Sequence, residues 1–183
     1  MKQVLLFFWE ILKIFIIALL IVIPIREFVF QPFFVKGQSM EPNFHDYDYL
    51  IVDELSYRFH QPERGDVIVF KNPLNPQQKF IKRIIGLPGE KVIIKGGKII
   101  IEKEGKSFVL DESSYLPPGT KTPGNVEVLL KEDEYFVLGD NRHSSYDSRS
   151  FGPIKKSYII GKVAFKIWPF SAFAKNHSLN LSQ

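Results

Sequence analysis

A serine in a tight loop is the first residue of this sequence that could act as a nucleophile. Ser39 lies in the segment KGQSMEPNF, where Gly37 and Pro42 predict a loop rather than the interior of a helix or strand. Such a loop can present a hydroxyl to a substrate with backbone N–H groups nearby, and these are the parts of an oxyanion hole. By itself the pattern also fits an ordinary turn serine, so a catalytic role requires a base.

A lysine in an apolar strand is the candidate base. Alternation along the segment FIKRII predicts a strand that places Phe80, Lys82 and Ile84 on one face. A lysine between two apolar neighbours is partly dehydrated, which disfavours the ammonium form and lowers the pKa. The neutral amine can then take the proton of a serine hydroxyl, as histidine does in a triad. The alternative is an edge-strand lysine whose charge reaches water along its stem.

A third polar segment reads GDNRHSSYDSRSFGP and is dense in hydroxyls and paired charges. Asp140 with Arg142, and Asp147 with Arg149, are expected to fix this loop through charge-assisted hydrogen bonds. Ser145 would then be a buried hydroxyl able to orient the amine of the candidate base. The alternative is a solvated polar turn between two strands.

The elements that position these residues begin with an apolar segment, residues 4–25, which reads VLLFFWEILKIFIIALLIVIPI. As a helix it spans roughly 30 Å, about the thickness of the hydrocarbon core of a bilayer. Glu10 and Lys13 interrupt it three positions apart and can pair on one face. No A-x-A-like cleavage site follows, and a surface-lying amphipathic helix would need more polar residues. We therefore predict a retained single-pass anchor, whose orientation the flanking charges do not decide.

From residue 27 to residue 183 the sequence changes to short β-type segments, which we expect to form the catalytic domain. Segments typical of strands occur at 48–53, 66–71, 79–85, 91–94, 98–101, 135–138 and 158–168. Gly96 and Gly97 predict a two-residue hairpin turn. Residues 102–125 are rich in proline and glycine and predict a loop-rich excursion or a small subdomain. The pattern favours a mainly β body of the barrel or sandwich kind.

Composition excludes several other classes of site. The chain has no cysteine, which removes disulfides, thiolate metal sites and a cysteine nucleophile. Its four histidines show no close metal-ligand spacing, so we expect neither a metal nor a cofactor. The formal charge of +4 is spread along the chain without the basic cluster typical of nucleic-acid binding. A lipid bilayer is the more natural partner for this charge.

Taken together and in this order, the apolar segment and four short boxes resemble the bacterial type I signal peptidases. The boxes are Ser-Met-x-Pro at Ser39 to Pro42, Arg-Gly-Asp with an apolar strand at Arg64 to Phe70, Lys-Arg-apolar-apolar-Gly-Leu-Pro-Gly at Lys82 to Gly89, and Gly-Asp-Asn-Arg-x-x-Ser-x-Asp-Ser-Arg at Gly139 to Arg149. The resemblance covers most of the chain outside about 95–133. That stretch varies in the family, and we expect it to be an insertion.

The resemblance implies a site and a mechanism. By matching position, Ser39 and Lys82 form a Ser/Lys dyad that cleaves signal peptides from exported preproteins through an acyl-enzyme. Ser145 orients the lysine, while Asp147 and Arg149 brace the loop that carries it. The family fold is a largely antiparallel β body anchored by one transmembrane helix, with the catalytic domain on the extracytoplasmic side of the cell membrane.

The resemblance also implies how substrate is bound. An extended peptide lies along a strand edge, with small residues at the positions one and three before the cut. The residues that match the family's pocket lining are Phe33, Val35, Phe80 and Ile81. Gly37 stands where part of the family has a serine that donates to the oxyanion. Only backbone donors, chiefly the N–H of Ser39, are therefore expected in this role.

Two other functions compete with this interpretation. A self-cleaving Ser/Lys repressor has related chemistry, but the anchor and the lack of a helical DNA-binding domain argue against it. A membrane-tethered peptide-binding module with an inactive site is the other alternative. Such a module would not need both Ser39 and Lys82.

Overall fold

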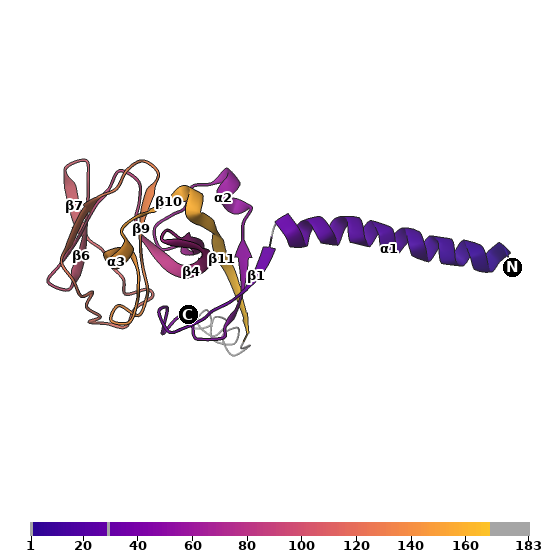
Figure 1. Ribbon diagram of the computed structural model, residues 1–183, viewed down its shortest axis with the longest axis horizontal. Helices are drawn as coiled ribbons and strands as arrows, with labels where there is room; N and C mark the ends of the chain where they lie inside the picture. Colours follow the sequence, from indigo (N-terminus) through magenta and orange to yellow (C-terminus); the bar gives the residue numbers. More distant parts are fainter. Residues whose placement is uncertain (1, 29, 169–183) are drawn as a thin grey trace, which may run out of the picture.

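The computed structural model of the protein describes residues 2–28 and 30–168. These residues form one long helix followed by a body of antiparallel strands (Figure 1). The helices are α1 (Lys2–Phe28), α2 (Ser56–Phe59) and α3 (Ser148–Phe151). The strands are β1 (Phe30–Phe34), β2 (Tyr49–Asp53), β3 (Val67–Asn72), β4 (Asn75–Gly86), β5 (Lys91–Lys95), β6 (Lys98–Lys103), β7 (Lys106–Val109), β8 (Val126–Leu129), β9 (Glu134–Leu138), β10 (Ile154–Lys155) and β11 (Ile159–Trp168).

Helix α1 extends away from the β body, which it joins next to β1 (Figure 1). Its segment Lys2–Val22 has a mean hydropathy of 2.6 and is long and apolar enough to cross a membrane. Lys13 Nζ lies 2.7 Å from Glu10 Oε1, so the predicted pairing of these two charges on one face is confirmed. After α1, the described residues up to 168 contain no helix longer than a single turn.

The larger sheet has seven strands in the order β1-β2-β11-β3-β4-β9-β10, and its neighbouring strands pair antiparallel. Hairpin-connected β3 and β4 lie at its centre, with Ile68 opposite Lys82. Strand β11, although late in the chain, lies between β2 and β3. It therefore joins the part of the sheet that leads to and from Ser39 to the part that carries Lys82.

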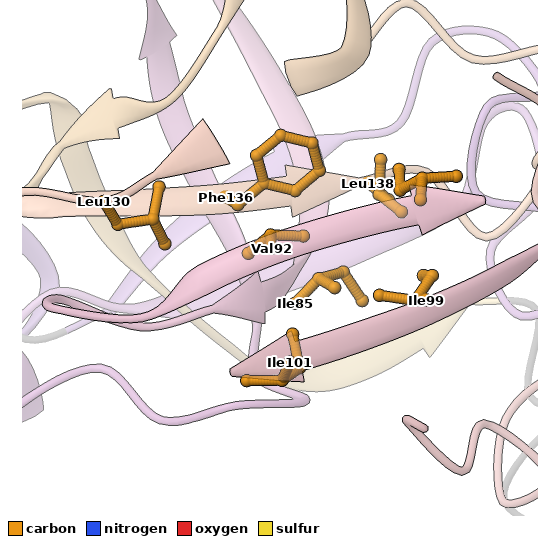
Figure 2. Close-up of a cluster of buried hydrophobic side chains, with 8 residues drawn as sticks. Ile85, Val92, Ile99, Ile101, Leu130, Phe136 and Leu138 are labelled. Carbon is orange, nitrogen blue, oxygen red and sulfur yellow. The ribbon is translucent and has the colours of Figure 1, made fainter. Parts of the chain in front are cut away.

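The smaller sheet has four strands in the order β7-β6-β5-β8 and lies at the end of the body far from α1 (Figure 1). Lys95 pairs with Lys98 across Gly96 and Gly97, which have φ values of 61° and 79°. This confirms the predicted two-residue hairpin, because a tight turn of this kind needs positive φ at both positions. One face of the sheet packs against β9 through a cluster of buried side chains that includes Val92, Ile99, Ile101, Phe136 and Leu138 (Figure 2).

The stretch 102–125 is not only loop. It contains the end of β6 and all of β7, a short strand that pairs with β6 and exposes every one of its residues. The region therefore contributes a strand to the smaller sheet as well as loop. Because no residue of β7 is buried, its sequence has no alternating apolar pattern from which a strand could be predicted.

Candidate active site

Ser39 lies in a tight loop between β1 and β2. Gly37 adopts a φ of 87°, a left-handed conformation that favours glycine, and its N–H donates to Asp46 Oδ1 at 2.8 Å. The side chain of Met40 is fully buried and fixes the residue after the serine in the core. The loop is thus held on both sides of Ser39, which is partly exposed, as the sequence predicts for a presented hydroxyl.

Lys82 lies in the middle of β4 and points its amine at this serine. Its Nζ donates to Ser39 Oγ at 2.7 Å and to the carbonyl oxygen of Ile81 at 2.9 Å. The side chain is only 3% exposed. On the same strand face, the Phe80 ring lies 5.6 Å from Nζ and Ile84 is buried in the core. The apolar surroundings predicted from alternation are therefore present. The alternative, an edge-strand lysine whose charge reaches water, is wrong.

Burial lowers the pKa of the Lys82 amine from 10.5 to about 8, because the charged ammonium is desolvated. Asp147 and Asp140 oppose this shift by attracting the positive charge. With a pKa of about 8, about one amine in ten is neutral at pH 7. A neutral amine in contact with a hydroxyl has the properties of a general base.

Ser145 lies beside the dyad, but not in the contact expected for it. Its Oγ is buried and has no hydrogen-bond partner among the described residues. A Cβ added to Gly139 would collide with this hydroxyl and with the carbonyl oxygen of Ser39, so the three residues meet at one point. The expected hydrogen bond between Ser145 and the Lys82 amine is not formed among the described residues; Nζ donates to Ser39 and to the backbone of Ile81.

The pairing of Asp147 with Arg149 is confirmed. The fully buried carboxylate of Asp147 accepts from Arg149 Nε and Nη2, both at 2.8 Å, and from the N–H of Gly139 at 3.1 Å. Asp147 is also the N-cap of α3, where its side chain accepts from the backbone N–H of Arg149. The carboxylate therefore ties the start of the loop, at Gly139, to the helix that ends it.

The pairing predicted for Asp140 and Arg142 is wrong. Asp140 accepts instead from Arg83 Nε and Nη2 at 2.8 and 2.7 Å, and Arg142 pairs with Glu112. Alternation along β4 puts Arg83 on the face opposite Lys82, which is where Asp140 comes to lie. Sequence proximity favoured the local partner, whereas the fold brings together charges that are 57 residues apart.

Asn43 is a further residue of the site that sequence reasoning did not single out. Its Nδ2 donates to Asp140 Oδ2 and to the carbonyl oxygen of Tyr115, both at 2.7 Å. The backbone N–H of Asn141 donates to the carbonyl oxygen of Ser39 at 3.1 Å. The loop that carries the serine is thus fastened to the loop that follows β9 at two points.

A cleft of about 140 Å³ opens beside the dyad. Its lining includes Ser39 and Lys82 together with all the expected substrate-binding residues, which are Phe33, Val35, Phe80 and Ile81. Residues of β1 and the turn after it and residues of β4 thus contribute to the same cleft. Within residues 2–28 and 30–168, no group of three or more His, Asp or Glu side chains is arranged to hold a metal ion.

A hydroxyl in contact with a buried, weakly basic amine at the side of a cleft has the parts of a serine hydrolase. The profile of the family described as "Signal peptidase, peptidase S26" matches residues 8–168. The chain therefore belongs to the signal peptidase I family, and it is an endopeptidase of the serine class.

The chain is also similar to individual proteins. The chain is 39% identical over 166 residues to "Probable signal peptidase I-2" of Synechocystis, and the aligned region covers 87% of this chain and 73% of that protein. It is 33% identical over 172 residues to "Signal peptidase IB" of Staphylococcus aureus, with 87% and 89% covered. A crystal structure of a signal peptidase I from Enterococcus faecalis is 31% identical and covers 57% of this chain and 97% of its own, with a TM-score of 0.47.

Proposed function

We propose that the protein is a membrane-anchored signal peptidase in which Ser39 is the nucleophile and Lys82 the general base. The contact of 2.7 Å between Lys82 Nζ and Ser39 Oγ carries this proposal. When the amine is neutral, the same contact runs in the opposite sense, with the hydroxyl donating to the nitrogen. Burial supplies the neutral amine, because it lowers the pKa of Lys82 to about 8.

The proposed reaction passes through an acyl-enzyme. Lys82 takes the proton of Ser39 Oγ as this oxygen bonds to the carbonyl carbon of the substrate. Collapse of the tetrahedral intermediate breaks the C–N bond, and the departing amine takes the proton from Lys82. Water then loses a proton to Lys82, attacks the ester and releases the peptide, and Ser39 recovers its proton. The backbone N–H of Ser39 is the proposed oxyanion donor, since Gly37 offers no side-chain hydroxyl.

Small side chains before the cut fit the size of the cleft. Its volume is about 140 Å³, and Phe33, Val35, Phe80 and Ile81 are among the side chains that line it. We propose that an extended preprotein segment lies in this cleft. In this arrangement backbone pairing provides affinity and the apolar lining selects small residues.

Helix α1 is the proposed anchor, with the catalytic body on the extracytoplasmic side, as in the type I signal peptidases it resembles. Phe34, 65% exposed, and Phe165, 57% exposed, are aromatic side chains suited to contact with the bilayer interface. A chain that lacks residues 2–22 should leave the membrane fraction but keep weak binding to anionic vesicles. Complete solubility in the presence of vesicles would contradict the interfacial contact.

Ser39→Ala and Lys82→Ala test the dyad directly. Each should reduce cleavage of a preprotein that carries an Ala-x-Ala site to background, while Lys71→Ala, at an exposed position of β3, serves as the control. Mass spectrometry of the wild type with an activated ester of the same peptide should find the acyl group on Ser39. Cleavage by Ser39→Ala would overturn the dyad, and a wild type without turnover would favour the inactive binding module.

A further inference from the structure

A segment of the insertion, residues 112–123, contacts the parts of the chain that carry and surround Ser39 and Lys82. It contacts the loop of the nucleophile, the strand of the base and the loop after β9. The contacts join Glu112 to Arg142, Tyr115 to Asn43 and Arg83, Thr122 to Arg142, and Pro123 to Arg149. A loop that only connected strands would not be expected to meet three separate parts of the site.

The strongest of these contacts is between Glu112 and Arg142. The two carboxylate oxygens of Glu112 accept from Nη1 and Nη2 of Arg142, a two-point pairing that fixes the guanidinium plane. Arg142 is among the largest fully buried side chains of the described structure. Since Asp140 is bonded to Arg83, Glu112 is the carboxylate that compensates this buried charge. A buried guanidinium without its partner would move toward water or distort its loop.

Tyr115 strengthens the same attachment. Its hydroxyl donates to Glu112 Oε1 at 2.6 Å, which orients the carboxylate toward Arg142. Its ring lies 4.1 Å from the guanidinium carbon of Arg83, and its carbonyl oxygen accepts from Asn43. Glu112 and Tyr115 therefore form one unit with the charged residues that flank the dyad.

Arg142 connects this unit to the reacting serine. Its Nε donates to the carbonyl oxygen of Gly139 at 3.0 Å. Two residues further along the same loop, the backbone N–H of Asn141 donates to the carbonyl oxygen of Ser39 at 3.1 Å. We infer that Glu112 is a positioning residue for the peptidase reaction, acting through Arg142 to hold the 139–141 backbone against Ser39. This inference rests on the proposed Ser39/Lys82 dyad.

The experiment measures turnover per competent site. The burst of acylation by an activated ester of an Ala-x-Ala peptide counts the sites that react, and the steady-state rate divided by this count gives kcat per site. For Glu112→Ala, kcat per site should fall about 10- to 100-fold with KM unchanged, the size expected for a small misplacement of reacting groups. Glu112→Gln, which keeps the shape without the charge, should fall about threefold to tenfold.

Glu127→Ala is the matched control, because it removes a carboxylate of the same insertion from a solvent-exposed pair with Lys91. It should match the wild type. If Glu112 served folding alone, its variants would show fewer competent sites but a normal kcat per site, and this result would overturn the inference. Ser39→Ala in the same assay tests the dyad separately, because a burst from that variant would overturn the proposed function instead.

Discussion

The backbone of Gly139 lies so close to the Ser145 hydroxyl that any side chain at position 139 would occupy the same space. The carbonyl oxygen of Ser39 closes the position from another side. Gly139 is therefore required by contact rather than by backbone conformation: the backbone after β9 can approach Ser39 and Ser145 this closely only because this residue has no side chain.

Gly139→Ala should reduce kcat about 100-fold and destabilise the fold by about 1–3 kcal/mol, because the added methyl displaces the backbone next to Ser39. Removing the hydroxyl as well, in Gly139→Ala with Ser145→Gly, should not restore activity, since the clash with the Ser39 carbonyl oxygen remains. Peptide cleavage and thermal unfolding measure the two effects. Ser150→Ala, at an exposed position in α3, is the control. Full rescue by the double variant would contradict this account.

Activity should depend on pH through Lys82. The amine acts in its neutral form, and burial lowers its pKa to about 8, so kcat/KM should rise about tenfold per pH unit below 8 and level off above it. A pH profile on an uncharged peptide substrate measures this. A profile that is flat between about pH 6 and 9 would show that the base has a different pKa.

The free energy of unfolding should also depend on pH through the Lys82 amine, and it should increase as the pH rises. The folded pKa of Lys82, about 8, is below the unfolded value of 10.5, so the unfolded chain binds the proton more tightly. The burial cost, about 3 kcal/mol, is complete below pH 8 and disappears as the pH rises through 10.5. Lys82→Met should therefore be inactive yet more stable than the wild type at pH 7, with the difference narrowing toward pH 10.5 in urea unfolding.

Arg149→Ala should destabilise the protein by about 3 kcal/mol, because it leaves the fully buried carboxylate of Asp147 without its partner. Arg149→Lys should recover part of this, as it keeps the charge without the two-point contact. Lys131→Ala provides the comparison, since Lys131 is 78% exposed in its pair with Glu134 and should change stability by no more than about 0.5 kcal/mol. Equal effects of the two alanine variants in urea unfolding would argue against a brace at Asp147.

Val35→Ala should widen the specificity. Val35 is buried and lines the cleft, so the smaller side chain leaves room for an additional methyl group on the substrate. We expect kcat/KM for peptides with valine in place of alanine before the cut to improve roughly tenfold relative to the alanine peptide. A series of peptides varied one position at a time gives the ratio. An unchanged ratio at both positions would place the specificity pocket elsewhere.

The parts of the site that sequence predicted are those set by local pattern. The strand around Lys82, with its apolar face, follows from alternation over six residues, and the loop at Ser39 follows from Gly37 and Pro42. The partner of Asp140 could not be predicted in this way. Asp140 pairs with Arg83 rather than Arg142 because the fold brings the loop after β9 next to β4. The local spacing of residues carries no information about which segments become neighbours.

The contacts of the insertion with the site could not be predicted from the sequence either. Glu112 and Tyr115 lie in a stretch rich in proline and glycine that gave no periodic signal, and their partners are 30 residues or more away along the chain. Charge-assisted contacts of this range appear only when the two sheets have been assembled. Residues of this kind are found from structure, not from pattern.

The place of β11 in the sheet has a consequence for biosynthesis. Ser39 and Lys82 emerge from the ribosome early, but the strand that separates β2 from β3 comes last among the strands described. Until that strand has been made, β2 and β3 lack the strand that pairs with both of them, so the two parts of the sheet are joined only by contacts between loops and side chains. A nascent chain that stops before β11 therefore contains Ser39 and Lys82 without the strand that joins their two parts of the sheet, and we expect such a chain to be inactive.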